Sequence, residues 1–224
     1  MQEAEEMYLR ALRGKEEAWG PKHTSTLDTV NNLGLLYSDQ GKMQEAEEMY
    51  LRALRGMEEA WGPKHTSTLD TVNNLGNLYS NQGKMQEAEE MYLRALRGKE
   101  AAWGPKHTST LDTVNNLGLL YSNQGKMQEA EEMYLRALAG YQEAEGNHGR
   151  RVEDLRVQLS ALDANSRSSS ASMTLAGHTT THREARAQSQ SNRSLIGVLT
   201  QENSEGSIRR RRKRDLILRL LGRR

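Results

Sequence analysis

The chain of 224 residues is built largely from one segment that recurs every 42 residues. The twelve residues that begin at Met1 return unchanged at Met43, Met85 and Met127. The first three full periods differ at only four positions, which are 15/57/99, 17/59/101, 35/77/119 and 39/81/123. A fixed period of this length is typical of stacked units that cannot each bury an apolar face alone. The sequence therefore predicts a repeat array.

The charge divides the chain into two regions. Residues 1–146 contain 15 Lys and Arg against 23 Asp and Glu, whereas residues 147–224 contain 16 against 7. This division indicates an acidic folded part followed by a basic tail. Since the sequence has no cysteine, disulfides, thiolate zinc sites and thiol catalysis are excluded. No run of 18 apolar residues occurs, so we predict no transmembrane segment and a cytoplasmic location.

Each period predicts a first helix that ends in a short turn. In the unit that begins at Thr24, apolar residues from Leu27 to Tyr37 recur at helical spacing. The hydroxyls of Thr24 and Ser25 are the expected N-caps. Gly41 suits the left-handed position that closes such a helix. A turn this short makes the next helix antiparallel to the first.

A second helix is predicted from residue 43 to residue 61. Its first turn is rich in glutamate, which suits the positive end of the helix dipole. Pro63 follows its end, since proline cannot continue a helix and disfavours helical geometry just before it. Gly56 lies inside this helix. Because glycine costs about 1 kcal/mol relative to alanine in a helix, we expect a weak point or a bend there.

Small and apolar residues repeat at the positions where two helices must pack. In the first complete unit they are Val30, Leu33, Gly34, Tyr37, Gly41, Ala46, Tyr50 and Ala53, and all eight recur in the next two units. This pattern resembles the tetratricopeptide repeat. The 42-residue period and the segment Asn-Asn-Leu-Gly-Leu-Leu-Tyr resemble the repeats of kinesin light chains, and also the near-identical arrays of fungal NLR-like proteins. The resemblance covers residues 1 to about 146.

The resemblance implies an all-α fold, a right-handed superhelix of helix pairs. Residues 1–19 are then a second helix without a first helix, and three helix pairs follow up to residue 146. A capping helix is expected within residues 147–164, and residues 165–224 are expected to be a disordered basic tail. Because the repeat begins in mid-unit at Met1, we expect the chain to be a piece of a longer array.

The resemblance also implies that the first helices line a concave groove that binds peptide segments of partner proteins. The candidate peptide-binding residues are Asn31, Leu35, Asp39, Asn73, Asn77, Asn81, Asn115, Leu119 and Asn123. Amides both donate and accept hydrogen bonds, which suits an extended peptide backbone. An alternative is that the asparagines only solvate an exposed face or brace neighbouring repeats. Two of the four variable positions belong to this set, and the other two are expected on the second helix, away from the groove.

No residue pattern indicates catalysis, a cofactor or a metal. His23, His65 and His107 occur once per repeat, so they are expected to lie too far apart to share an ion. The paired glutamates at the start of each second helix match the helix dipole rather than an acid/base pair. The sequence therefore favours a non-catalytic interaction scaffold with an unidentified protein or peptide partner.

Two further functions remain open at this stage. The unpaired helix at residues 1–19 would leave an apolar edge through which the chain could form a homo-oligomer. The basic run is Arg209, Arg210, Arg211, Arg212, Lys213 and Arg214. Such a run suits nuclear import, contact with nucleic acid or an anionic surface, or no specific role.

Overall fold

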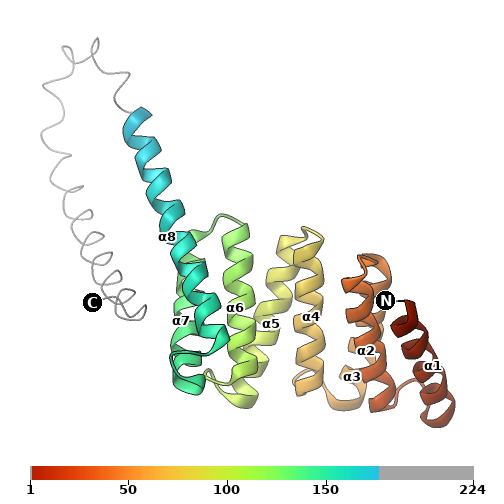
Figure 1. Ribbon diagram of the computed structural model, residues 1–224. Coiled ribbons are helices and arrows are strands. Elements are labelled where there is room, and N and C mark those ends of the chain that lie inside the picture. Colours follow the sequence, from red (N-terminus) through yellow and green to blue (C-terminus); the bar gives the residue numbers. More distant parts are fainter. Residues whose placement is uncertain (1, 177–224) are drawn as a thin grey trace, which may run out of the picture. The chain divides into compact units, whose positions relative to one another are not determined.

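The computed structural model describes the backbone of residues 2–176 and the side chains as far as residue 164. Within this part the chain is all-helical, as predicted, with no strand. The helices are α1 (Gln2–Trp19), α2 (Thr24–Asp39), α3 (Met43–Trp61), α4 (Thr66–Asn81), α5 (Met85–Trp103), α6 (Thr108–Asn123), α7 (Met127–Glu145) and α8 (Arg150–Ala176). Consecutive helices from α1 to α7 pack against each other in chain order (Figure 1). They belong to a unit that covers residues 1–149, and α8 begins a second unit.

Each first helix is capped by the histidine that precedes it. His23 has an extended backbone, and its Nδ1 accepts a hydrogen bond from the backbone N–H of Ser25. Thr24 is already helical, so the predicted hydroxyl cap was wrong. The imidazole ring also lies 5.1 Å from the ring of Trp19, which explains why the side chain holds this position. The same arrangement recurs at His65 and His107.

The turn between the two helices of a pair has the predicted glycine cap. Gly41, Gly83 and Gly125 all have φ of 75°, the left-handed conformation that glycine adopts without steric cost. The N–H of Lys42 then donates to the carbonyl of Tyr37 at 2.9 Å. This bond satisfies a carbonyl that the end of α2 would otherwise leave free.

Two glycines allow the helices of one pair to approach closely. A Cβ atom at Gly34 would lie 2.9 Å from the ring of Tyr50, and one at Gly56 would lie 2.5 Å from a methyl of Leu27. Because α3 is one helix from Met43 to Trp61, the prediction of a break at Gly56 was wrong. Gly56 is instead the seat on which the Leu27 side chain packs.

Apolar side chains of adjacent pairs merge into one core. One cluster joins α3, α4 and α5, and its buried members are Ala46, Tyr50, Leu54, Val72, Leu75, Leu78 and Ala95. Burying a leucine side chain contributes about 1.5–3 kcal/mol. Each pair is therefore stabilised mainly by its neighbours, as expected for a repeat array.

The helix α8 keeps the period although its sequence has diverged. Arg150 lies 42 residues after Thr108, and the four buried apolar residues are Val152, Leu155, Leu159 and Leu162, which form one stripe as predicted. The helix continues to Ala176, so the expected irregular tail does not begin at residue 165. No glycine or proline interrupts residues 150–176, which removes the usual helix-stop signals. The role of α8 as a cap stays a prediction, and the basic run 209–214 lies outside the described residues.

Candidate binding face on the first helices

The first helices carry an exposed stripe that the packing of the array does not use. On α2 it consists of Asp28, Asn32, Leu35 and Asp39, whose spacing places them on one helix face. The equivalent residues are Asp70, Asn74, Asn77 and Asn81 on α4, and Asp112, Asn116, Leu119 and Asn123 on α6. These twelve residues are called the first-helix face below. It includes six of the nine predicted binding residues.

Apolar side chains lie exposed in the middle of this face. Leu35 is 48% exposed and Leu119 is 46% exposed. The residues at the helix ends, Asp39, Asn81 and Asn123, are exposed as well. The face therefore offers apolar contact area between polar groups, which is a common arrangement in binding sites.

The predicted asparagine ladder braces neighbouring repeats. The Oδ1 atom of Asn31 accepts hydrogen bonds from Thr71 Oγ1 at 3.1 Å and from Asn74 Nδ2 at 3.3 Å. Asn73 accepts in the same way from Thr113 and Asn116. These bonds agree with the alternative left open by the sequence. Asn31 and Asn73 are half-buried beside the exposed stripe, where they fix one first helix against the next.

The third ladder residue has different surroundings. Asn115 Oδ1 is buried, and no hydrogen-bond partner for it occurs in the described part of the chain. The donors used in earlier repeats, a threonine and an asparagine, are replaced 42 residues later by Leu155 and Gln158. The hydrogen-bond pattern of the earlier repeats is therefore not repeated at Asn115.

At the first variable position of the face, asparagine has a bridging role that leucine cannot have. Asn77 Oδ1 accepts from Tyr92 OH at 2.7 Å and from Asn116 Nδ2 at 3.2 Å. It joins α4 to both α5 and α6, whereas Leu35 and Leu119 remain exposed at the same position. The exchange of leucine for asparagine thus trades apolar surface for a brace.

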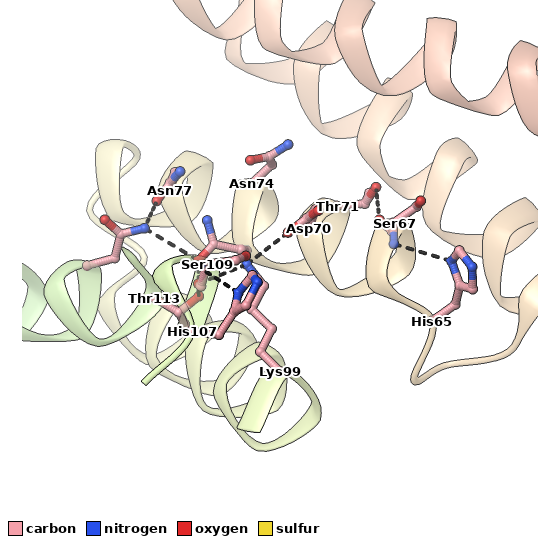
Figure 2. A network of polar contacts seen from close by, with 12 residues as sticks. His65, Ser67, Asp70, Thr71, Asn74, Asn77, Lys99, His107, Ser109 and Thr113 are labelled. Atoms are coloured by element: carbon pink, nitrogen blue, oxygen red, sulfur yellow. Dashed lines mark hydrogen bonds and ion pairs between the residues drawn. The ribbon is translucent and has the colours of Figure 1, made fainter. Parts of the chain in front are cut away.

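A buried lysine was missed by the sequence analysis. Lys99 on α5 is 2% exposed, and its Nζ lies 2.9 Å from Asp70 Oδ1 on α4 and 3.4 Å from the carbonyl oxygen of Ser109 (Figure 2). The variable position 15/57/99 is therefore inside the array and reaches the first-helix face. A lysine that alternates with methionine within an apolar stripe was the available signal. Met57 packs at the same place in α3, where its sulfur accepts a hydrogen bond from Thr71.

On the second helices, charged side chains join consecutive repeats by ion pairs. Arginine–glutamate pairs link positions 36 residues apart, and they are Arg52–Glu16, Arg94–Glu58 and Arg136–Glu100. Lysines at the joints add pairs between positions 37 residues apart, such as Lys106–Glu143 at 2.7 Å. Ala101 occupies the position that would pair with Lys64. The fourth variable position, 17/59/101, therefore decides whether a joint carries this ion pair.

The helix turns carry a polar cluster that also spans two repeats. Glu47 of α3 accepts hydrogen bonds from Tyr79, Gln82 and Lys84 at 3.2–3.3 Å. Burial alone would raise the pKa of Glu47, but hydrogen bonds from Lys84, Gln82 and Tyr79 outweigh it and hold the pKa below its ordinary value of 4.5. Lys84 also lies over the ring of Tyr79, 5.1 Å from its centre. The cluster is a structural clasp between repeats.

The described residues contain no group of three or more His, Asp or Glu side chains that could hold a metal ion. The three joint histidines each cap a helix, as shown above. In the same part of the chain, none of the helices is both long and apolar enough to cross a membrane. The site with the clearest unused binding capacity in the array is therefore the first-helix face.

The helix pairs, the turn glycines and the packing glycines are those of a tetratricopeptide repeat. The family model of this repeat matches residues 1–59, 31–101 and 67–143. These matches cover more than half of the sequence, and the chain belongs to the tetratricopeptide repeat family. A search of curated proteins found no match.

Solved structures similar to this chain are kinesin-light-chain-like repeat proteins. The crystal structure of BtubC (BKLC) from P. vanneervenii has a TM-score of 0.65 and 26% identity, over 72% of this chain and 64% of that one. Two crystal structures of nearly identical TPR-like repeats from a putative kinesin light chain of Podosopora anserina have TM-scores of 0.64 and 0.63. Their identities are 22% and 23%, over 79% and 78% of this chain and 84% and 83% of those. The resemblance to fungal NLR-like arrays stays a prediction.

Proposed function

We propose that the array is a non-catalytic scaffold that binds an extended peptide segment of a partner protein across the first-helix face. The tetratricopeptide repeat fold generally serves protein–protein interaction. Stacked repeats of this kind present long surfaces whose curvature suits a peptide. The observation that carries the proposal is the exposure of Leu35 and Leu119, because the core uses leucines at most other first-helix positions.

The spacing of the helices supports a concave shape for this face. The backbones of consecutive first helices make contact, α2 with α4 and α4 with α6. No contact of that extent joins α3 to α5 or α5 to α7 in the array. Elements on the inner side of a curved stack lie closer together than those on its outer side. The first helices therefore suit the inner side.

The charge of the face indicates the chemistry of the ligand. Asp28 and Asp39 are exposed on it, and the basic side chain nearest to it, Lys99, is buried against Asp70. A peptide that ends in a carboxylate finds no exposed lysine or arginine among the twelve residues. A neutral or basic segment with apolar side chains for Leu35 and Leu119 fits better.

The experiment begins with a displayed library of random peptides, selected against the full chain. A selected peptide is then labelled and its affinity measured by fluorescence anisotropy. The double variant Leu35→Asp/Leu119→Asp is expected to weaken binding at least about tenfold, because central apolar contacts carry most of the binding energy.

A matched control separates the face from general effects of an added charge. Leu51 is an exposed leucine on the second helix α3, and Leu51→Asp is expected to leave the affinity unchanged. Equal binding by the double variant and the wild-type chain would reject the proposal. Equal weakening by Leu51→Asp would also reject it.

A further inference from the structure

One face of α1 is uncovered in the described array. Met7 is 64% exposed and Trp19 is 55% exposed, and Ala11 is exposed between them. Tyr8 is only partly buried. The opposite side of α1 is covered, since Leu12 is 7% exposed where α1 packs against α2. The unpaired helix predicted from the sequence therefore exposes a continuous apolar face.

The other second helices show what normally covers this face. Residues 1–14, 43–56 and 85–98 have the same sequence. In α3 and α5 the residues equivalent to Ala11 and Tyr8 are Ala53 and Ala95, with 0% exposure, and Tyr50 and Tyr92, with 1% and 3%. The same amino acids are buried in these repeats because a first helix packs on them.

Two seats on α1 define the helix that would fit. A Cβ atom at Gly14 would have no atom within 4 Å, whereas at Gly56 and Gly98 it would collide with a leucine of the first helix, Leu27 or Leu69. A glycine seven residues after that leucine, Gly34 or Gly76, contacts the tyrosine of the second helix. Seven residues are about two helical turns, so the leucine and the glycine lie on one face. Gly14 and Tyr8 are the matching empty seats.

The helices of this chain do not supply the missing pattern. The leucines of α2, α4 and α6 are already seated on Gly56, Gly98 and Gly140. In α8, which keeps the 42-residue register, the equivalent positions hold Glu153 and Ser160. Its other residues at second-helix-facing positions, Arg156 and Asp163, are polar too. A second copy therefore has no ready helix of the right kind in its described part.

We infer that α1 is a docking site for a helix from outside the described residues that carries the first-helix pattern of this repeat. Such a helix has a leucine for Gly14 and, seven residues later, a glycine for Tyr8. Its docking would bury Met7, Ala11 and Tyr8 as their equivalents are buried in α3. The site lies on the array end and shares no residue with the first-helix face, so each can fail without the other.

The probe is a fluorescein-labelled peptide with the sequence of residues 24–40, added to the full chain and followed by anisotropy. Gly14→Leu fills the seat with the chain's own side chain and is expected to weaken peptide binding about tenfold or more. Because the space at Gly14 is open, the variant is expected to keep the circular dichroism spectrum of the wild type. The matched control Ala60→Leu adds a leucine at another exposed helix position and should bind the peptide normally.

A peptide in which the residue equivalent to Leu27 is aspartate tests the seat from the other side, and it is expected to bind about tenfold more weakly. The inference is overturned if the peptide does not bind the wild-type chain, or if Gly14→Leu binds it equally well. It is also overturned if the chain without peptide sediments as a dimer that Gly14→Leu makes monomeric, because a second copy would then occupy the face.

Discussion

The helices α1 and α3 share the sequence of residues 1–14 and 43–56 but differ in their surroundings. In α3 the small residues Ala46, Ala53 and Gly56 are buried beneath a first helix, whereas Ala11 and Gly14 of α1 are exposed. The amino acids are equal, so the difference in burial comes entirely from the neighbour. In a repeat array, the role of a residue is therefore set by its place in the stack as well as by its place in the unit.

The same substitution in the two helices should have opposite effects. Gly56→Ala places a Cβ atom 2.5 Å from Leu27, and the resulting overpacking is expected to lower the free energy of unfolding by about 1–3 kcal/mol. Gly14→Ala meets no atom and is expected to raise it by up to about 1 kcal/mol, because alanine favours the helix. Denaturant titration of both variants measures the difference. Effects of equal sign would show that the two glycines have the same role.

The comparison extends to α5, where Lys99 replaces the Met57 of α3. Asp70→Asn is expected to lower the free energy of unfolding by about 1–2 kcal/mol, since Lys99 then stays buried without its charged partner. Lys99→Met is expected to change stability by less than about 1 kcal/mol, because methionine already fills this position in α3. Asp28→Asn is the matched control, since Asp28 is exposed and the residue at the lysine position of its repeat is Met57. An equal loss in Asp28→Asn and Asp70→Asn would argue against the buried ion pair.

The asparagine ladder allows a third comparison, between its middle and its end. Asn31→Ala removes the acceptor of Thr71 and Asn74 and is expected to lower the free energy of unfolding by about 1 kcal/mol. The loss is moderate because the Thr71 hydroxyl also has the carbonyl of Ser67 as an acceptor. Asn115→Ala removes an oxygen that has no partner among the described residues, and its effect should stay within about 0.5 kcal/mol. Thermal or chemical unfolding of both variants tests whether the ladder braces the array.

What the sequence predicted correctly is local or periodic. The helix pairs, the left-handed Gly41 and the stripe of α8 depend on residues a few positions apart, so that spacing alone indicates them. The family followed from eight small and apolar positions that recur in step. These features were sufficient to place the candidate face on the first helices.

What the sequence did not predict depends on contacts between units. The hydrogen bonds of Asn31 join residues 40 and 43 positions apart, and they depend on how far one pair is rotated against the next. The same holds for Lys99, whose burial follows from the position of α4 and α6 around it. His23 was missed as a cap because its role requires the ring of Trp19 beside it. Gly56 was interpreted by its helix propensity, although close packing decides its role.

The smallest expected effect concerns the clasp at the helix turns and its dependence on pH. The pKa of Glu47 lies below 4.5 in the folded chain, so its contribution to stability is present above pH 4.5 and is lost as the pH falls through the lowered pKa. Glu47→Gln should therefore be less stable than the wild type at about pH 6, by the 0.2–1 kcal/mol typical of exposed ion pairs, and this difference should shrink toward about pH 3. Glu48→Gln removes the same charge at an exposed position of α3 and controls for the change in net charge. A difference that stays constant with pH, or an equal one in Glu48→Gln, would show that the hydrogen bonds from Tyr79, Gln82 and Lys84 do not stabilise the array through the ionised carboxylate.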